Sequence, residues 1–375
     1  MSDYRYRAGE LLVHVDDCAA VAPDLAHAGY RPADASGSVR RFVGGRVRVP
    51  DLLGHLRARH GTALRVSPNH LYTADRIIWG SLRPRPTTEF LDDLPPLTEG
   101  HRVEVGVVDT GIVRHEGKPH PYIEGRVEFD PEDVDPVVPD ADGNPTGSDG
   151  HGTFVTGLVL REAPQAKVIM KGVVDRSTGE IEDLAVAHAI TRLGEKGVKL
   201  INLSFSGGSW EDVPPLAIED ALLNLGPDVV VVAAAGNRGS SQVLWPAALD
   251  LDRGDGVDRA TMVAVGATAL DGKVATFSGH GPWVSAYAPG AERVGPYFVP
   301  GYPTRYRNGD ASYNGWAEWS GTSFSAAIVT GRLAALMATN GGSATEAWES
   351  LKQGSGTIAV THVNGTVEYP HVSNT

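Results

Sequence analysis

The segment SGTSFSAAIVTG at residues 320–331 decides which fold this sequence can adopt. It passes from a turn of small residues into a run of Ser, Ala, Ile and Val, which predicts a buried helix whose first turn presents Ser323. Gly321 and Thr322 leave space for other backbone to approach that hydroxyl. A serine hydroxyl becomes a useful nucleophile only beside a base and beside donors for the oxyanion that it generates, so the rest of the chain must supply both.

Three other segments place polar side chains at the ends of buried elements. Asp109 follows the apolar run at residues 103–108 and precedes Thr-Gly, as expected for a carboxylate at the carboxyl end of a central parallel strand. His151 opens the glycine-rich helix start HGTFVTG, and Asn237 closes the apolar run VVVVAAAGN. We therefore predict that a carboxylate, an imidazole and an amide meet the hydroxyl of Ser323.

The chain order Asp, His, Ser is the order of the catalytic triad in subtilisin, and the four segments resemble those of the subtilisin-like (subtilase) serine peptidases. The resemblance covers residues 101–340 and implies an α/β fold of three layers with a mostly parallel central sheet. It also implies that Ser323 is the nucleophile, His151 the general base and Asp109 the partner of that base. The amide of Asn237 and the backbone N–H of Ser323 would form the oxyanion hole.

One position departs from the family pattern. Phe154 stands where the family usually has a second histidine. That histidine is not the catalytic base, so we expect the change to alter packing beside the cleft and to leave the chemistry in place.

The resemblance also locates the groove that binds the substrate. The segment LINLSFSGG at residues 200–208 resembles the family segment that pairs with the substrate backbone, and STGEIED at residues 177–183 resembles the outer wall of the groove. Pairing of this kind holds any extended peptide through main-chain hydrogen bonds and leaves selectivity to side-chain pockets. The substrate-binding residues implied by the resemblance are Ser204, Phe205, Ser206, Gly207, Ala234, Ala235 and Gly236.

Residues 1–74 carry a small α+β pattern of their own. We expect strands at residues 11–15, 42–49 and 63–66, a further strand near residues 31–40, and helices at residues 19–27 and 50–57. The pattern resembles the ferredoxin-like prodomain of subtilases, and the ending VSPNHLY at residues 66–72 is similar to the close of such prodomains. The resemblance implies a domain that assists folding and inhibits the enzyme by placing its tail in the cleft. An unrelated ferredoxin-like accessory domain is the alternative.

The remaining boundaries follow from composition and turn signals. Residues 75–100 are rich in proline and predict an extended linker, where we expect any maturation cut. Residues 101–352 form the predicted peptidase domain, and residues 291–319 within it form an insertion beside the cleft. Residues 353–375 are predicted to form a C-terminal hairpin and tail, with the turn at Asn364-Gly365.

Composition limits the classes of partner and the compartment. The chain has 375 residues, 41% of them apolar, and a formal charge of −13, which argues against a nucleic-acid partner because phosphate binding needs a basic surface. No apolar run approaches the length of a membrane span, so we expect no membrane partner. The N-terminal region contains no basic-then-apolar secretory signal, so we expect a cytoplasmic protein. Cys18 is the single cysteine, which excludes an intrachain disulfide.

A metal ion is the one cofactor that the sequence leaves open. Residues 140–144, Asp-Ala-Asp-Gly-Asn, alternate oxygen ligands as calcium loops do, but no glutamate follows at the spacing of an EF-hand. We therefore expect a solvated acidic loop and no cofactor, with calcium binding as the alternative.

The functional prediction is a serine endopeptidase that hydrolyses peptide bonds through an acyl-enzyme on Ser323. We expect it to act on a peptide or protein substrate in intracellular processing or regulatory proteolysis, and to mature by removing its own N-terminal domain. Two alternatives stay open. One is a transpeptidase or macrocyclase that acts on a precursor peptide through the same acyl-enzyme, and the other is a non-catalytic binding or scaffold protein whose cleft is closed by residues 1–74.

Overall fold

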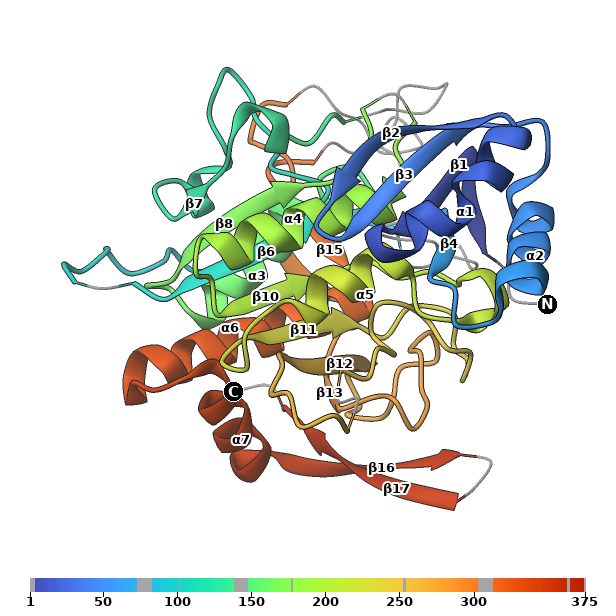
Figure 1. Cartoon of the computed structure of the whole chain (residues 1–375). Helices are drawn as coiled ribbons and strands as arrows, with labels where there is room; N and C mark the ends of the chain where they lie inside the picture. Colours follow the sequence, from blue (N-terminus) through green and yellow to red (C-terminus); the bar gives the residue numbers. More distant parts are fainter. Residues whose placement is uncertain are drawn as a thin grey trace.

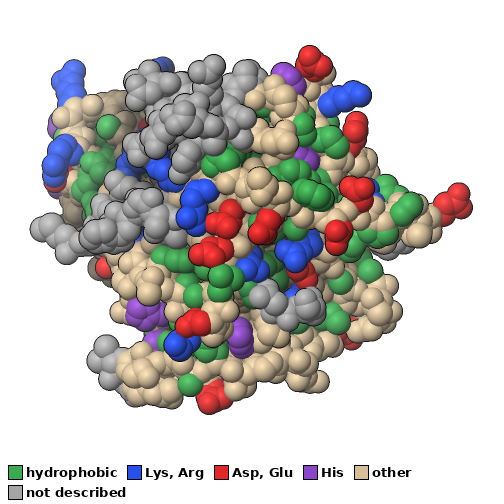
Figure 2. Space-filling model, turned by 180° about the vertical axis from the view of Figure 1, so that it is seen from behind, with side chains coloured by type: hydrophobic (Ala, Val, Ile, Leu, Met, Phe, Trp, Pro, Cys, Tyr) green, Lys and Arg blue, Asp and Glu red, His purple; other side chains and the backbone are tan. Residues whose placement is uncertain are grey.

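A computed structural model describes residues 4–72, 83–100, 102–137, 148–176, 178–251, 254–302, 313–362 and 365–373 of the chain. A small N-terminal domain packs against one side of a larger domain that is built on a nine-stranded sheet (Figure 1). Among the described residues, no helix combines the length and the apolar character that a membrane span requires. On the face seen in Figure 2, acidic and basic side chains lie interspersed.

The large sheet has the strand order β16-β17-β13-β12-β11-β10-β6-β8-β7. Its parallel strands are β6 (Glu104–Asp109), β7 (Val127–Glu128), β8 (Lys167–Gly172), β10 (Leu200–Leu203), β11 (Val230–Ala234), β12 (Thr261–Thr268) and β13 (Ala286–Pro289). The central strands are apolar along almost their whole length because both faces of the sheet are covered. The carboxyl ends of these strands therefore meet at one edge of the sheet.

Helices cover both faces of the sheet, which confirms the three-layer α/β fold. One face packs on α3 (His151–Glu162), α6 (Thr322–Asn340) and α7 (Ala344–Gly354), and the other on α4 (Asp183–Glu195) and α5 (Leu216–Leu223). Alternate residues of β11 divide between the two apolar cores, since Val230 and Val232 belong to the first and Val231 and Ala233 to the second. Three single turns of 3₁₀ helix are η1 (Pro121–Ile123), η2 (Pro131–Asp133) and η3 (Trp210–Asp212).

The N-terminal domain has the ferredoxin-like order βαββαβ. Its elements are β1 (Arg5–His14), α1 (Val15–His27), β2 (Tyr30–Ser36), β3 (Val39–Gly44), α2 (Val49–His60) and β4 (Val66–Tyr72). The strands form an antiparallel sheet in the order β2-β3-β1-β4, and β9 (Ile181–Glu182) of the larger domain adds to β4 as a fifth strand. The N-terminal sheet is thus extended by a short strand of the larger domain that lies directly before α4.

The boundaries within this domain differ from those that the sequence indicates. The strand expected at residues 42–49 ends at Gly44, because α2 already begins at Val49 with Pro50 in its first turn. The strand expected at residues 63–66 runs instead from Val66 to Tyr72, where β1 and β9 supply hydrogen-bonding partners on its two sides. Pattern alone missed this last strand because its sequence, VSPNHLY, is largely polar.

The described part of the predicted linker, residues 83–100, lies on the surface of the larger domain. β5 (Arg85–Pro86) pairs with β15 (Trp316–Trp319), which pairs with β14 (Arg293–Pro296). The Tyr313 hydroxyl donates a hydrogen bond of 2.6 Å to the carbonyl of Pro84. The segment therefore has fixed contacts with the predicted insertion at residues 291–319.

The C-terminal hairpin is part of the large sheet. β16 (Gly356–His362) pairs antiparallel with β17 (Gly365–His371), and His371 of β17 pairs with Tyr287 of β13. The expected hairpin is therefore present, although Asn364 in its turn lies outside the described residues.

We predict that Gly152→Ala destabilises the chain. A Cβ at this position in α3 would lie 2.3 Å from the carbonyl oxygen of Gly111, which follows β6, and backbone cannot move away as a flexible side chain can. Overpacking of this kind costs about 1–3 kcal/mol, so the thermal midpoint measured by calorimetry should fall by several degrees. Gly54→Ala, in exposed α2 with no atom within 4 Å of the new Cβ, is the matched control and should not lower it. Equal midpoints for the two variants would contradict the close approach of α3 to β6.

Candidate active site

Asp109 and His151 form a buried hydrogen-bonded pair at the carboxyl edge of the sheet. Asp109 is the last residue of β6, His151 is the first of α3, and the Asp109 Oδ1 to His151 Nδ1 distance is 2.7 Å. Asp109 Oδ1 also accepts a hydrogen bond of 2.7 Å from the backbone N–H of Thr110. With Nδ1 bound to the carboxylate, Nε2 is the nitrogen of His151 that can act as a base.

Gly150 sets the direction in which the histidine enters the site. It precedes α3 with φ of +76°, a left-handed conformation that glycine adopts at little cost. A Cβ at Gly150 would lie 2.7 Å from the ring of Tyr297. Any larger residue would therefore displace either the tyrosine or the first turn of α3 that carries His151.

Aromatic rings enclose the imidazole of His151. Its ring centroid lies 5.3 Å from that of Trp319 and 5.6 Å from that of Phe324, and Phe154 packs on both of those rings. Phe154 is fully buried in this cluster, so the residue that departs from the family pattern acts through packing. Low polarity around the pair strengthens the contact between imidazole and carboxylate.

Ser323 lies at the same edge, in the first turn of α6. Its neighbour Phe324 contacts the ring of His151, and its own hydroxyl donates a hydrogen bond of 3.1 Å to the carbonyl of Ser204. A hydroxyl has one proton, so this bond and donation to an imidazole are alternative positions of the same group. The predicted nucleophile thus stands at the end of β10, beside the helix that carries the predicted base.

Buried polar side chains connect the end of β10 to α6. The Ser204 hydroxyl donates to the carbonyl of Ser323 at 3.1 Å and accepts from the amide of Asn202 at 2.7 Å. The Asn202 oxygen in turn accepts a hydrogen bond of 3.0 Å from the hydroxyl of Thr330, which lies about two turns after Ser323 in α6. Sequence reasoning missed Asn202 and Thr330, although an asparagine inside the apolar strand LINL is a signal that could have indicated a buried polar contact.

Asn237 is oriented by Thr322. Its Oδ1 accepts hydrogen bonds from the backbone N–H of Thr322 at 2.9 Å and from the Thr322 hydroxyl at 3.0 Å. Because the amide group is planar, Nδ2 is then directed to the opposite side, where a Cβ on Gly321 would lie only 3.4 Å away. The amide donor and the N-terminal end of α6 are thus arranged beside Ser323, as an oxyanion hole requires.

Comparison with known proteins agrees with this geometry. A model described as the subtilase family matches residues 100–365. The chain belongs to the subtilase family. Its residues 100–365 therefore form a subtilisin-like serine endopeptidase domain, and the three residues that the sequence predicts as a triad, Asp109, His151 and Ser323, lie within it at the end of β6 and in the first turns of α3 and α6.

Two curated subtilases illustrate the relationship in sequence. A thermophilic serine proteinase from Bacillus sp. (strain AK1) is 29% identical over 309 residues, which cover 76% of this chain and 66% of that protein. Thermitase from Thermoactinomyces vulgaris is 30% identical over 258 residues, which cover 66% of this chain and 79% of that protein. This chain therefore spans about two thirds of the length of the Bacillus proteinase.

Solved structures show the same fold. Fervidolysin from Fervidobacterium pennivorans, described as a keratinolytic enzyme related to subtilisin, is similar over 95% of this chain and 58% of its own, with a TM-score of 0.65 and 21% identity. The prenylagaramide maturation protease PagA is similar over 68% of this chain and 84% of its own, with a TM-score of 0.51 and 24% identity. At such identities these likenesses show the fold alone.

The substrate-binding residues that the subtilase pattern implies lie along two walls. Ser204, Phe205 and Gly207 follow β10. Ala234 ends β11, which is the neighbouring strand, and Ala235 and Gly236 follow it. Ser206, between Phe205 and Gly207, is partly exposed. Phe205 is buried with its ring 5.7 Å from that of Tyr72, and β9 pairs with Leu71 and Tyr72. The end of β4 therefore lies between the outer wall and the β10 wall.

Asp135 is a buried carboxylate that links the two segments of the catalytic pair. It accepts hydrogen bonds from the Thr110 hydroxyl at 2.7 Å and from the backbone N–H of Gly150 at 3.0 Å, next to Asp109 and His151 respectively. Burial raises the pKa of Asp135 to about 7, against the lowering effect of those hydrogen bonds.

Metal binding at the acidic loop is not addressed by the described residues. Residues 140–144, where calcium is the alternative to a solvated loop, lie outside them. Within the described part of the chain, no group of three or more His, Cys, Asp or Glu side chains is arranged to hold a metal ion.

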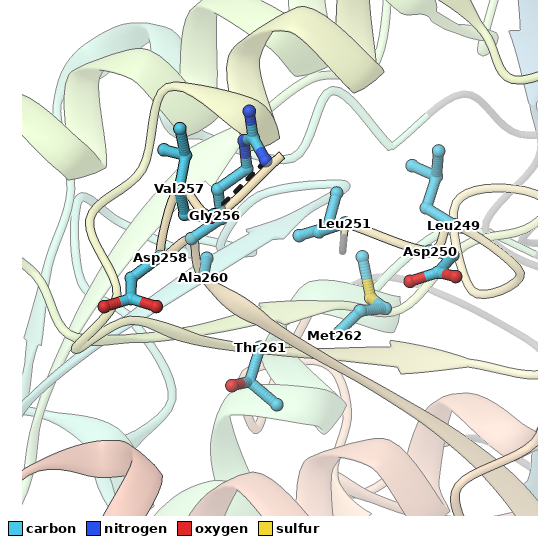
Figure 3. Close-up of a pocket in the computed structure, with 10 residues that line it drawn as sticks. Leu249, Asp250, Leu251, Gly256, Val257, Asp258, Ala260, Thr261 and Met262 are labelled. Atoms are coloured by element: carbon cyan, nitrogen blue, oxygen red, sulfur yellow. Dashed lines mark hydrogen bonds between the residues drawn. The ribbon is translucent and has the colours of Figure 1, made fainter. Parts of the chain in front are cut away.

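A separate hollow of about 410 Å³ opens at the other end of the sheet, lined by residues 249–251 and 256–262 (Figure 3). Thr261, at its base, is the first residue of β12 and pairs with Val230, the first residue of β11. Asp109 is the last residue of parallel strand β6, so this hollow and the catalytic pair lie at opposite edges. The hollow is not part of the peptidase site.

Asn237→Leu should lower kcat and leave KM nearly unchanged, because an oxyanion donor acts mainly in the transition state. The precedent for removing one such donor in subtilisin is a loss of about 10²–10³ in kcat. Steady-state hydrolysis of an internally quenched peptide measures both constants. Asn224→Leu, at an exposed asparagine after α5, is a control that should leave both constants as they are. A rise in KM alone would contradict the assigned role.

Asp135→Asn should change how stability depends on pH. The folded pKa of about 7 exceeds the usual value for Asp, so the folded state holds a proton that the unfolded chain has already lost. Stability contributed by this group is therefore present at low pH and is lost as pH rises towards 7. Relative to the parent chain, the variant's thermal midpoint should improve between pH 5 and pH 8, with Ser323→Ala in both chains to suppress self-cleavage. A difference that stays constant over this range would contradict the raised pKa.

Proposed function

We propose that this chain is the precursor of a serine endopeptidase, in which residues 1–74 form an inhibitory prodomain and the described end of β4 lies in the substrate groove. One observation carries the proposal. Tyr72, the last residue of β4, pairs with Ile181 of β9 and also packs against Phe205 and the backbone of Gly207. An extended segment in this position holds both walls of the groove as a bound peptide would.

The chemistry follows from the groups at the carboxyl edge of the sheet. Ser323 Oγ attacks the peptide carbonyl carbon while its proton passes to His151 Nε2, and Asp109 stabilises the imidazolium. The oxyanion that forms is held by the Asn237 amide and the backbone N–H of Ser323. The C–N bond then breaks as His151 returns the proton to the leaving amine. Water, activated by the same histidine, releases the acyl group from Ser323.

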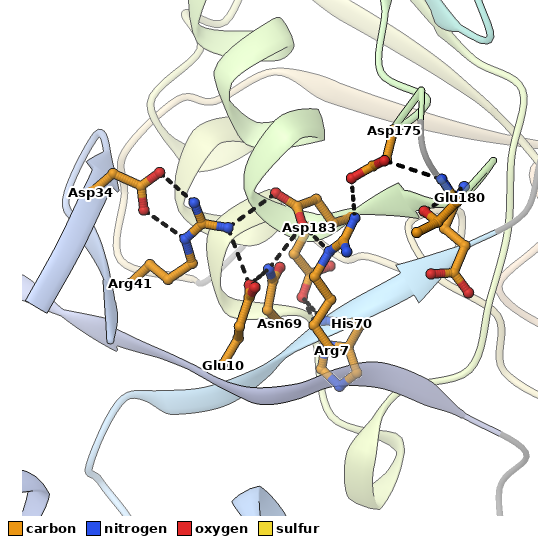
Figure 4. Close-up of polar contacts among 11 residues, drawn as sticks. Arg7, Glu10, Asp34, Arg41, Asn69, His70, Asp175, Glu180 and Asp183 are labelled. Atoms are coloured by element: carbon orange, nitrogen blue, oxygen red, sulfur yellow. Dashed lines mark hydrogen bonds and ion pairs between the residues drawn. The ribbon is translucent and has the colours of Figure 1, made fainter. Parts of the chain in front are cut away.

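An ion-pair network docks the N-terminal domain on the outer wall (Figure 4). Arg7 forms ion pairs with Glu182 and, at 2.7 Å, with Asp175. Arg41 contacts Glu182 at 3.4 Å, and the amide of Asn69 donates to the same carboxylate at 3.3 Å. These charges are partly buried, so they contribute more to the choice of docking position than to net stability.

Docking of this kind suits a domain that also assists folding. The central sheet joins strands that are far apart in the chain, and such pairings fold slowly because the loops between them must close first. β4 pairs with β9 immediately before α4, and the N-terminal domain packs on α4 and α5. A preformed antiparallel sheet therefore offers a surface on which this side of the larger domain can order.

The proposed role in the cell is processing or regulatory proteolysis of a peptide or protein substrate. The occupied groove supports it, because an enzyme that is made in an inhibited form is active only after release. We place the maturation cut within residues 75–100, between the described end of β4 and the start of the subtilase domain.

Ser323→Ala should abolish both self-cleavage and labelling by a fluorophosphonate probe. Mass spectrometry of the purified parent chain should show loss of an N-terminal fragment with the new terminus between residues 75 and 100, while the variant stays intact. Ser325→Ala, two residues further along α6, is the matched control and should behave as the parent chain does. Equal labelling of the Ser323 variant and the parent chain would show that Ser323 is not the nucleophile.

The two alternative functions, a transpeptidase and a non-catalytic scaffold, would give different results. A transpeptidase incubated with a long linear peptide would give a product lighter than the hydrolysis product by one water or joined to an added amine. A non-catalytic scaffold would show neither labelling nor self-cleavage.

A further inference from the structure

Asp183 is a buried carboxylate in the substrate groove, and its hydrogen-bond donors come from the segment that occupies the groove. It is the first residue of α4, directly follows β9, and has no exposed surface. Three donors reach it: the ring Nδ1 of His70 at 2.7 Å (Figure 4), the backbone N–H of His70 at 3.0 Å, and the hydroxyl of Tyr72. All three belong to β4, so a groove residue of the larger domain is satisfied by the segment that occupies the groove.

The spacing of the two side chains follows from strand geometry. Side chains two residues apart point to the same face of a strand, so His70 and Tyr72 project together while Leu71 does not. β4 runs antiparallel to β9 with Tyr72 opposite Ile181, which brings this face to the start of α4. Any extended peptide that takes the same register would present its own pair of alternate side chains to Asp183.

The ring of Tyr72 occupies a position in the groove beside Phe205 and Gly207, which is called its seat below. Its ring centroid lies 5.7 Å from that of Phe205, and a Cβ on Gly207 would come within 2.6 Å of its Cδ1. Phe205 directly follows Ser204, whose carbonyl accepts a hydrogen bond from the hydroxyl of Ser323. The seat is therefore continuous with the groove wall that begins at the nucleophile.

The hydroxyl of Tyr72 is a dedicated donor. Burial and the neighbouring Asp183 raise the pKa of Tyr72 well above its usual value, so the phenol keeps its proton. Phenylalanine would fill the same seat but would leave a buried carboxylate short of a donor, which is the arrangement that discriminates most strongly between an aromatic ring with a hydroxyl and one without.

His70 supplies the other side-chain donor in a fixed tautomer. Its Nε2 accepts a hydrogen bond of 3.0 Å from the backbone N–H of Trp210, so the proton of the neutral ring is on Nδ1, which faces Asp183. The ring of Tyr4 covers His70 at a centroid distance of 6.3 Å. Because Tyr4 belongs to the N-terminal domain, a free peptide lacks this cover, and its histidine should matter less than its tyrosine.

We propose that Asp183 is a specificity-determining residue, which selects extended peptide substrates that carry a tyrosine in the seat occupied by Tyr72 and a hydrogen-bond donor two residues before it. The inference rests on the proposed function, since it takes β4 as the model of a bound substrate. It assigns to this enzyme a sequence preference of the form His-x-Tyr on the N-terminal side of the bond that is cut.

Three internally quenched peptides test the preference. The first has the chain's own sequence from residues 66–80, VSPNHLYTADRIIWG, the second has phenylalanine in place of its tyrosine, and the third has leucine in place of its histidine. They are assayed with the mature enzyme, which is prepared by allowing the purified full-length chain to cleave itself. The value of kcat/KM for the first peptide should exceed that for the second by about tenfold or more, and the third should fall between them.

The variant Asp183→Leu tests whether Asp183 causes the preference for tyrosine over phenylalanine. Leucine has a similar shape and no acceptor, so the ratio between the tyrosine and phenylalanine peptides should fall to about one or below. Glu195→Gln, at the exposed far end of the same helix, is the matched control and should keep the ratio of the parent chain. If Asp183→Leu fails to fold, the ratio measured with the parent chain decides.

Each remaining outcome has a distinct meaning. Equal cleavage of the tyrosine and phenylalanine peptides overturns the preference and leaves the peptidase assignment in place. If the ratio of kcat/KM between the tyrosine and phenylalanine peptides is unchanged in Asp183→Leu, Asp183 does not determine the specificity. Labelling of Ser323 without cleavage of any peptide shows that the β4 sequence is not substrate-like and overturns the inference. Absence of both labelling and self-cleavage overturns the proposed function, and the inference with it.

Discussion

Two reciprocal hydrogen bonds between Ser204 and Ser323 fix the geometry on which the rest of the site depends. The hydroxyl of each residue donates to the carbonyl of the other, at 3.1 Å in both cases. They join the carboxyl end of β10 to the first turn of α6. β10 lies next to β6 in the parallel sheet, so the same contact sets Ser323 relative to Asp109. It also sets where the groove wall begins, because Phe205 and Gly207 follow directly.

Sequence reasoning found the residues whose position depends on local pattern. An apolar strand followed by Asp109 or by Asn237 identifies a carboxyl edge, and parallel pairing then brings such edges together without further information. The helix starts at His151 and Thr322 have the same local character. The family model over residues 100–365 confirms the peptidase fold that these signals predicted.

The residues that the sequence did not indicate are those whose partners are distant in the chain. The sequence indicated Asp183 only as the last residue of the predicted outer wall, and its contacts with His70 and Tyr72, more than one hundred positions earlier, were not indicated. Asn202 and Thr330 become a pair only when β10 and α6 meet. β4 and β5 are short or polar segments that become strands because an edge of another element is available to pair with them. No periodicity within a segment contains that information.

Buried carboxylates near the carboxyl edge of the sheet share one physical property: each accepts a hydrogen bond from a donor in a different segment of the chain. Asp109 binds His151, Asp135 binds Thr110 and Gly150, and Asp183 binds β4. Leaving a buried acceptor without its donor costs about 1–3 kcal/mol, and more when the acceptor is charged, whereas the intact hydrogen bond adds less net stability. Such groups therefore act chiefly by excluding other arrangements. At Asp109 and Asp135 the excluded arrangements are those that misplace the base.

At Asp183 the same argument applies to whatever occupies the groove. Departure of β4 takes away three donors at once, and the carboxylate must then take its hydrogen bonds from a substrate or from water that enters the opened groove. The N-terminal domain supplies its donors at the high effective concentration of an attached segment, while a substrate must bring them from solution. A single carboxylate can thus make the attached domain bind tightly and make the released groove selective, because both effects arise from the free energy of the hydrogen bonds that the carboxylate accepts.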